Sequence, residues 1–107
     1  MATTARFFVL WGRPGDPAAF EQHYRDVHIP LALEIPGLRR YTLSRDIAPV
    51  HGKNACYVVA EIDFDDLGSL QAAFQSPQGR ATAADAALLA EQASVQMMIY
   101  ELEMVLS

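Results

Sequence analysis

The chain has 107 residues, of which 51% are hydrophobic and 20% charged, as expected for one compact domain. Thirteen acidic and eight basic residues give a formal charge of −5, which argues against nucleic acid or an anionic membrane as a partner. No unbroken apolar stretch approaches the ~20 residues of a membrane span, and no signal-like segment opens the chain. We therefore expect a single cytoplasmic domain over residues 1–107, with its one cysteine, Cys56, as a buried thiol.

Residues 6–45 predict a strand, a helix and a second strand. Arg6–Gly12 is a continuous apolar run, the pattern of a strand buried on both faces. Asp16 and Pro17 supply an N-cap carboxylate and a proline at the first helical position, so a helix should begin there. Leu38–Arg45 alternates in polarity and predicts the second strand, with one wetter face.

Pro30 should disturb the first helix. It lacks an amide hydrogen and disfavours helical backbone at the residue before it, so we expect a break near His28 and Ile29. Alternatively, Pro30 opens a short second helical piece over Leu31–Ile35.

The remaining elements follow from turn and capping signals. Ala48–Asn54 contains Pro, Gly and Asn and predicts a loop before a third strand over Ala55–Phe64. Asp65 is the expected cap of the second helix, and Ser76 with Pro77 should cap its second piece. Val95–Leu106 predicts a long fourth strand.

This order is β-α-β-β-α-β, with the second helix broken in two. It predicts an α+β fold of the ferredoxin-like type, an antiparallel four-stranded sheet with helices on one face. The alanine-rich segment Arg80–Ala90 suggests close packing of the last helix on the sheet. The open face of the sheet needs a cover, and a second copy of the chain is the simplest one. We expect a homodimer formed by sheet-to-sheet packing, with Glu101 and Glu103 near that contact.

The first helix holds the densest cluster of reactive side chains. At 3.6 residues per turn, Tyr24 and His28 lie about 40° apart around the helix axis, whereas His23 and His28 lie about 140° apart. The two histidines should therefore diverge, with His23 in solvent, and no ligand set at metal-binding spacing is present. The sequence predicts no metal site.

Tyr24 and His28 share the apolar face of this helix. A buried phenol or imidazole costs roughly 1–3 kcal/mol if it has no hydrogen-bond partner. Two interpretations stay open: a ligand supplies the partner, or His28 bonds a backbone carbonyl at the helix break and only holds the bend.

Three motifs lie between His23 and Asp85: H-Y-x-x-V-H-x-P-L from His23, I-P-G-L-R-R-Y from Ile35, and S-P-x-G-x-x-x-x-A-D from Ser76. They resemble the EthD family, named for a protein linked to ethyl tert-butyl ether degradation, within the dimeric α/β-barrel superfamily. The resemblance implies a ferredoxin-like subunit with a ligand pocket between sheet and helices. The family's helix-one histidine and tyrosine correspond to His28 and Tyr24. Superfamily relatives include cofactor-free monooxygenases, cyclases and dehydratases, lactone isomerases and haem enzymes.

From these features we expect a cofactor-independent enzyme, either an oxidoreductase of the monooxygenase type or a cyclase or isomerase. Its substrate would be a small hydrophobic carbonyl or phenolic molecule. His28 would act as general acid and base, kept neutral by the amide dipoles of a helical piece opening at Pro30, and Tyr24 would orient a substrate oxygen. The expected wall residues are Phe7 or Phe8, Val9, Trp11, Phe20, Tyr41, Phe74, and Met97 or Met98.

Two alternatives remain at this point. The same pocket could belong to a binding or accessory protein of a degradation or biosynthetic pathway, with His28 and Tyr24 only anchoring the ligand. A haem protein with a histidine such as His28 as axial ligand is the third hypothesis.

Overall fold

The computed structural model describes residues 4–53 and 56–106. The strands are β1 (Ala5–Gly12), β2 (Arg40–Ser44), β3 (Cys56–Phe64) and β4 (Val95–Glu101). The helices are α1 (Pro17–His23), α2 (Ile29–Leu33), α3 (Leu67–Gln75) and α4 (Pro77–Leu89), and a π-helical turn, η1 (Tyr24–His28), joins α1 to α2.

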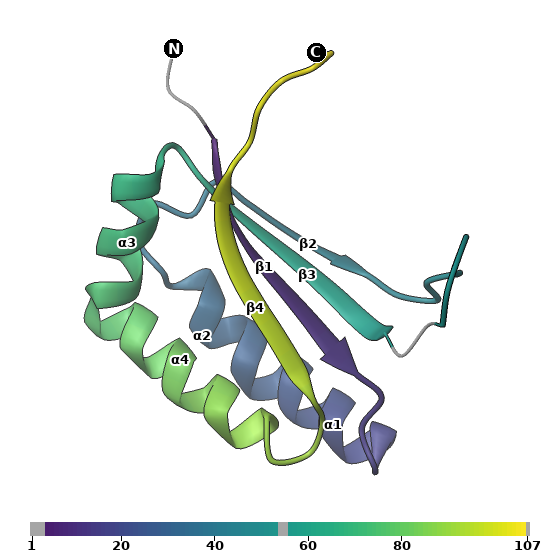
Figure 1. Ribbon diagram of the computed structural model, residues 1–107. Helices are drawn as coiled ribbons and strands as arrows, with labels where there is room; N and C mark the ends of the chain where they lie inside the picture. Colours follow the sequence, from purple (N-terminus) through teal and green to yellow (C-terminus); the bar gives the residue numbers. More distant parts are fainter. Residues whose placement is uncertain (1–3, 54–55, 107) are drawn as a thin grey trace.

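The four strands form one antiparallel sheet in the order β2-β3-β1-β4. All helices cover the same face of this sheet, and the other face carries none of them (Figure 1). The α+β, ferredoxin-like β-α-β-β-α-β architecture predicted from the sequence is confirmed.

Capping residues explain where the helices begin. The Asp16 carboxylate accepts a hydrogen bond from the Ala19 amide, and Ser76 Oγ accepts one from Gly79, as predicted for α1 and α4. The predicted cap of α3 is wrong by one residue. The carboxylate of Asp66, not that of Asp65, accepts a hydrogen bond from the Ser69 amide in the first turn of α3. Asp65 instead forms a bidentate ion pair with the guanidinium of Arg39.

The predicted disturbance near His28 and Ile29 takes the form of a π-helical turn rather than a break, and the alternative, a short second helical piece opening at Pro30, is confirmed by α2, whose first turn contains Pro30. Ile29 has helical dihedrals (φ −60°, ψ −46°), and its amide donates to the Tyr24 carbonyl five residues earlier. The π-helical turn η1 therefore absorbs the irregularity, since its wider hydrogen-bonded ring holds one extra residue. The helical path continues through Pro30 into α2, which ends at Leu33.

The fourth strand is shorter than predicted. It ends at Glu101, whose partner in β1 is Ala5, and the next pairing is a single bond from the Leu102 amide to the Thr4 carbonyl. The apolar residues that follow in the sequence do not lengthen the strand. A strand ends where its backbone pairing with the neighbouring strand, here β1, ends, even if its side chains continue to alternate in polarity. Glu103 consequently lies outside the strand. In the predicted loop, residues 48–53 contain no helix or strand, and Asn54 and Ala55 lie outside the described residues.

The core consists of two clusters of buried side chains between the sheet and the helices. One surrounds Trp11, Tyr24 and Leu89, and the other surrounds Phe64 and Leu70. Phe7 and Tyr41 touch both clusters. The region between the clusters is where the structure leaves space for a ligand.

Gly79 should be required for the contact between α3 and α4. A Cβ atom built there would lie 2.6 Å from Phe74 Cα and closer still to the Ala73 carbonyl oxygen. In an open helix, Gly→Ala stabilises by up to about 1 kcal/mol. We expect Gly79→Ala instead to lower the free energy of unfolding by about 1–3 kcal/mol, measured by denaturant titration. The control is Gly15→Ala, where no atom lies within 4 Å; similar values for both variants would contradict this close approach.

Candidate functional site

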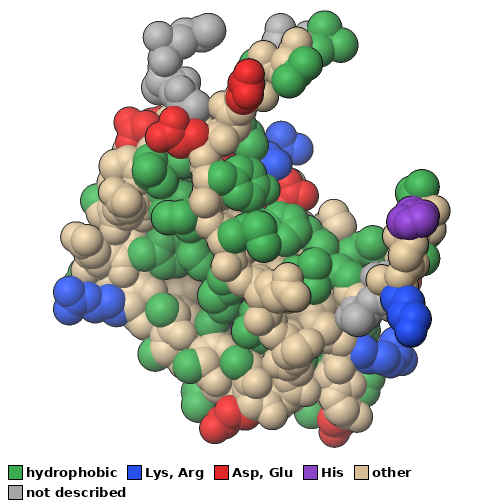
Figure 2. Space-filling model, viewed as in Figure 1, with side chains coloured by type: hydrophobic (Ala, Val, Ile, Leu, Met, Phe, Trp, Pro, Cys, Tyr) green, Lys and Arg blue, Asp and Glu red, His purple; other side chains and the backbone are tan. Residues whose placement is uncertain are grey.

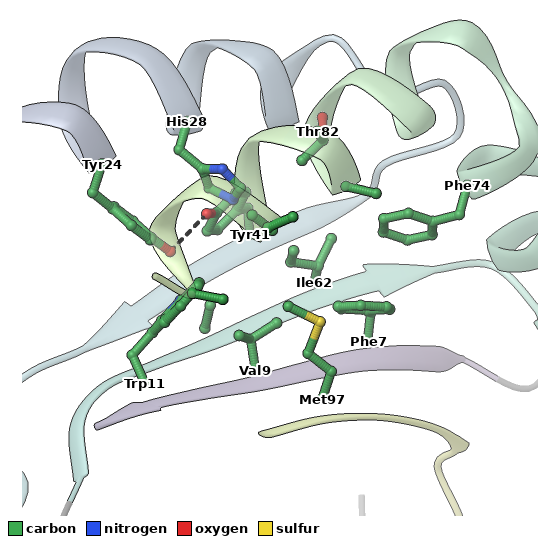
Figure 3. Close-up of a pocket in the computed structure, with 15 residues that line it drawn as sticks. Phe7, Val9, Trp11, Tyr24, His28, Tyr41, Ile62, Phe74, Thr82 and Met97 are labelled. Carbon is green, nitrogen blue, oxygen red and sulfur yellow. Dashed lines mark hydrogen bonds between the residues drawn. The ribbon is translucent and has the colours of Figure 1, made fainter. Parts of the chain in front are cut away.

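A cavity of about 350 Å³ lies between the helices and the face of the sheet that they cover (Figure 3). Every second residue of a strand contributes its side chain to the cavity floor, because alternate side chains point to the same face of a sheet. Phe7 therefore lines the cavity, and Phe8 lies on the opposite face. In the same way the side chain of Met97 lines the cavity, and that of Met98 points to the opposite face of the sheet.

Alanines of α4 keep this space open. Ala83, Ala86 and Ala87 of α4, and Ala90 at its C-cap, line the cavity on the helix side. Close packing of this segment on the sheet was expected, and it is found only near the C-terminal end of α4, where Leu89 joins the core cluster of Trp11 and Val58. The helix α4 packs mainly against α3, α2 and η1, so its short side chains leave room instead of filling it.

The edge strand β4 contributes Met97 to the cavity wall. Met97 and Ile99, which lie on the helix-covered side of β4, are 44% and 45% exposed. Hydrophobic side chains gather on this side in the space-filling view (Figure 2). An apolar ligand would therefore meet an apolar approach to the cavity.

Two tyrosines place hydroxyl groups at one end of the cavity. The hydroxyls of Tyr24 and Tyr41 lie 3.1 Å apart, within hydrogen-bond distance (Figure 3). Burial raises the pKa of each phenol above its usual range, so both carry their protons at neutral pH. Only one of these protons is needed for the bond between them. The pair can therefore donate the other to a ligand oxygen.

His28 lies beside Tyr24, with 5.2 Å between the ring centroids, and also lines the cavity. Its Nδ1 atom is 2.8 Å from Oδ2 of Asp85 on α4. This partner is a carboxylate, so the expected bond to a backbone carbonyl is wrong. The pKa of His28 is lowered mainly by burial, which outweighs the opposing effect of Asp85. The neutral form was expected, but its main cause is burial rather than helix dipoles.

His23 binds the other oxygen of the same carboxylate. Its Nε2 atom lies 2.7 Å from Oδ1 of Asp85, and its side chain is 29% exposed. The prediction that His23 is solvated and points away from His28 is therefore wrong. That prediction assumed 3.6 residues per turn, whereas the π-helical turn brings residues five apart close to the same face.

Most of the predicted wall residues are at the cavity. These are Phe7, Val9, Trp11, Tyr41, Phe74 and Met97. Phe20 is the exception, because it is fully buried behind the wall. Its ring stacks on Tyr24 at 5.7 Å and meets Trp11 edge-on at 5.4 Å, so it supports the site without facing it.

Sequence reasoning missed Asp85 and the contact of the Tyr41 hydroxyl with that of Tyr24. Asp85 was visible as the one acid in an alanine-rich helix, within the third motif, but its partners are more than 50 residues away. Tyr41 was predicted only as an apolar wall. Thr82 also lines the cavity, but its hydroxyl donates to the Gln78 carbonyl.

Other reactive groups lie away from this site. Cys56 is half-buried, and burial raises the pKa of its thiol, which disfavours the nucleophilic thiolate. Within residues 4–53 and 56–106, no group of three or more His, Cys, Asp or Glu side chains is arranged to hold a metal ion. None of the described helices is long and apolar enough to cross a membrane.

Comparison with known proteins identifies close relatives. The EthD domain matches residues 13–93. An uncharacterized 11.0 kDa protein encoded in the thcB-thcC intergenic region of Rhodococcus erythropolis is 33% identical over 101 residues, or 94% of this chain and 97% of the relative. The crystal structure of an EthD family protein from Bacillus halodurans C-125 has 32% identity and a TM-score of 0.82, covering 94% of this chain and 99% of that one.

A more distant structure shares the fold. SnoaB, a cofactor-independent oxygenase from Streptomyces nogalater, is 21% identical with a TM-score of 0.69, covering 98% of both chains. At this identity the likeness concerns the fold alone.

The buried His28 should make stability depend on pH. Because its pKa is lowered from 6.5 in the folded state, the unfolded chain binds more protons once the pH falls below about 6.5. The free energy of unfolding should then decrease, by at most about 1.4 kcal/mol per pH unit. We expect His28→Gln to reduce this loss in denaturant titrations between about pH 7.5 and about pH 5.5. The control, His51→Gln, removes an exposed loop histidine. Equal pH dependence in wild type and His28→Gln would refute this role.

Proposed function

Because the chain belongs to the EthD family, we propose that its cavity binds a neutral, hydrophobic small molecule with a carbonyl or phenolic oxygen and catalyses a proton transfer on it. The observation that carries this proposal is a cavity that is apolar except at one end, where His28, Tyr24 and Tyr41 meet. Its described lining contains no charged residue, so a carboxylate or phosphate would have no counter-ion there.

The reaction begins with the neutral imidazole of His28. It accepts a proton from a phenol, or from the carbon next to a carbonyl group. The electron pair left behind stays on the phenol oxygen, or moves from the carbon onto the carbonyl oxygen, and His28 becomes an imidazolium. The Tyr24 and Tyr41 hydroxyls donate a hydrogen bond to that oxygen as its charge develops, which lowers the barrier most in a cavity of low polarity.

An enolate or phenolate is the common starting point of several reactions. It can react with molecular oxygen, close a ring by attacking a second carbonyl, or regain the proton at another carbon. These outcomes are the cofactor-independent monooxygenase, cyclase or dehydratase, and isomerase types. The oxygenase SnoaB, which needs no cofactor, supports the first of them through its shared fold only.

A non-catalytic role as a binding or accessory protein is the second candidate. The predominance of apolar wall residues favours it, since such a wall holds a ligand without further chemistry. Native mass spectrometry of the purified protein distinguishes the candidates when combined with assays of any molecule that co-purifies. Absence of a Soret band in the same preparation would remove the haem hypothesis.

We also propose a homodimer in which the open faces of two sheets pack together. The strand residues that point away from the helices include Phe8, Leu10, Val59, Met98 and Tyr100. These side chains are half-buried to exposed in one chain. Towards one end of this face Arg6 pairs with Asp63 and with Glu61, which lies opposite Phe8, so these charged groups are paired with one another.

Binding of 4-nitrophenol tests the proton transfer, because the absorbance of this probe reports whether the phenol is ionised. We expect wild type to bind it as the phenolate, with His28 holding the proton. His28→Gln should bind the un-ionised phenol, and Tyr24→Phe should bind about tenfold more weakly because a hydrogen bond of roughly 1–1.5 kcal/mol is lost. His51→Gln serves as the control. An unshifted spectrum with bound wild type would count against His28 as the base.

The dimer is tested by placing a charge on the open face. We expect Met98→Asp to raise the dimer dissociation constant at least about tenfold, because a buried unpaired carboxylate is costly. Sedimentation velocity over a concentration series measures this change. Leu88→Asp is the matched control, since Leu88 is 54% exposed on the helical side. If both variants dimerise like wild type, another surface forms the interface.

A further inference from the structure

Asp85 is a buried carboxylate whose surroundings are unusual for a charged group. Its side chain is 7% exposed, on a helix where alanines dominate. A carboxylate in such a place is stable only when its oxygens accept hydrogen bonds. Within the described part of the chain, its recorded partners are His23 and His28, one on each oxygen.

This arrangement decides where the hydrogens of the two imidazoles lie. A carboxylate accepts hydrogen bonds and has none to donate. His28 must therefore carry its hydrogen on Nδ1, and His23 must carry one on Nε2. The lone pair of a neutral His28 is then on Nε2, the nitrogen away from Asp85, on a side chain that lines the cavity.

We propose that Asp85 is the positioning residue of the site: it holds His28 in the tautomer that presents a basic Nε2 to the cavity, and His23 keeps the carboxylate in place by binding its second oxygen. This inference deepens the proposed function, since it rests on His28 as the base. Neither His23 nor Asp85 needs to touch the substrate.

The proton balance follows from these positions. During the reaction, Nε2 of His28 gains the substrate proton, and Nδ1 keeps the hydrogen that it donates to Asp85. The new positive charge of the imidazolium lies 2.8 Å from the carboxylate, which stabilises it without taking the proton. When the product is protonated, Nε2 returns the proton and the starting tautomer is restored.

The π-helical turn is the part of the fold that makes this possible. His23 precedes η1, and His28, five residues later, ends it. Because a π-helical turn is wider than an α-helical turn, side chains at this spacing point to nearly the same side of the helix, and both imidazoles contact Asp85 on α4. The burial of the two rings differs: the His28 side chain is 9% exposed, and that of His23 is 29% exposed. His23 therefore closes the solvent side of the carboxylate, while His28 occupies the cavity side.

Nitrogen NMR of the protein with ¹⁵N-labelled histidine tests the tautomer without any ligand. In wild type we expect His28 to carry its hydrogen on Nδ1. In Asp85→Asn the side-chain amide can donate to Nδ1, so we expect His28 to shift to the Nε2–H form. Asp63→Asn is the matched control, because Asp63 is equally buried but bonds Arg6 on the other face of the sheet; it should leave the His28 signal unchanged.

The same variants are then titrated with 4-nitrophenol. We expect Asp85→Asn to reduce the ionised fraction of the bound phenol at least about tenfold while the phenol still binds. A wild-type His28 that carries its hydrogen on Nε2 would overturn the proposal. This result comes from the wild-type protein, so it does not depend on whether a variant folds. A folded Asp85→Asn protein with an unchanged His28 tautomer would overturn it too. If the tautomer shifts as expected but wild type never ionises the phenol, the proposed proton transfer fails and the positioning by Asp85 stands.

Discussion

The contact of one buried carboxylate with two histidines joins the two helical segments that enclose the cavity. Asp85 lies on α4, and both histidines belong to the irregular helix that runs from α1 through η1. Along its length α4 also packs against α2, α3 and η1, and Leu89 near its C-terminal end joins the core cluster on the sheet. The alanines of α4 then face open space, and the same interaction that orients the imidazole also bounds the cavity that it serves.

The sheet divides its side chains between two roles. One set of alternate residues, such as Phe7 and Met97, forms the cavity floor, and the other, such as Phe8 and Met98, forms the open apolar face. A shift of one residue in any strand would exchange these roles. The register of β1 with β3 and β4 therefore determines both the ligand site and the surface proposed for dimerisation.

The order of elements and most of the cavity wall could be predicted because they depend on local patterns. The caps at Asp16 and Ser76 and the apolar strand runs act over a few residues. The predictions that failed concern residues with partners far away in the sequence. Asp65, for example, does not cap α3, because its carboxylate pairs with Arg39. His23 was misplaced because a regular helix was assumed where η1 inserts an extra residue per turn.

The electrostatics of the cavity favour a site that is uncharged before the reaction. Burial lowers the pKa of His28 and raises those of Tyr24 and Tyr41, so each group is held in its neutral form. In the proposed reaction, charge appears only when a proton moves from the substrate to the imidazole, creating an oxyanion and an imidazolium together. The tyrosine hydroxyls would then face the first of these charges, and the Asp85 carboxylate, bonded to His28, would face the second. Because the tyrosine hydroxyls and the Asp85 carboxylate are already in place, the proposed proton transfer needs little reorganisation. A neutral substrate would also enter the cavity without displacing an ion.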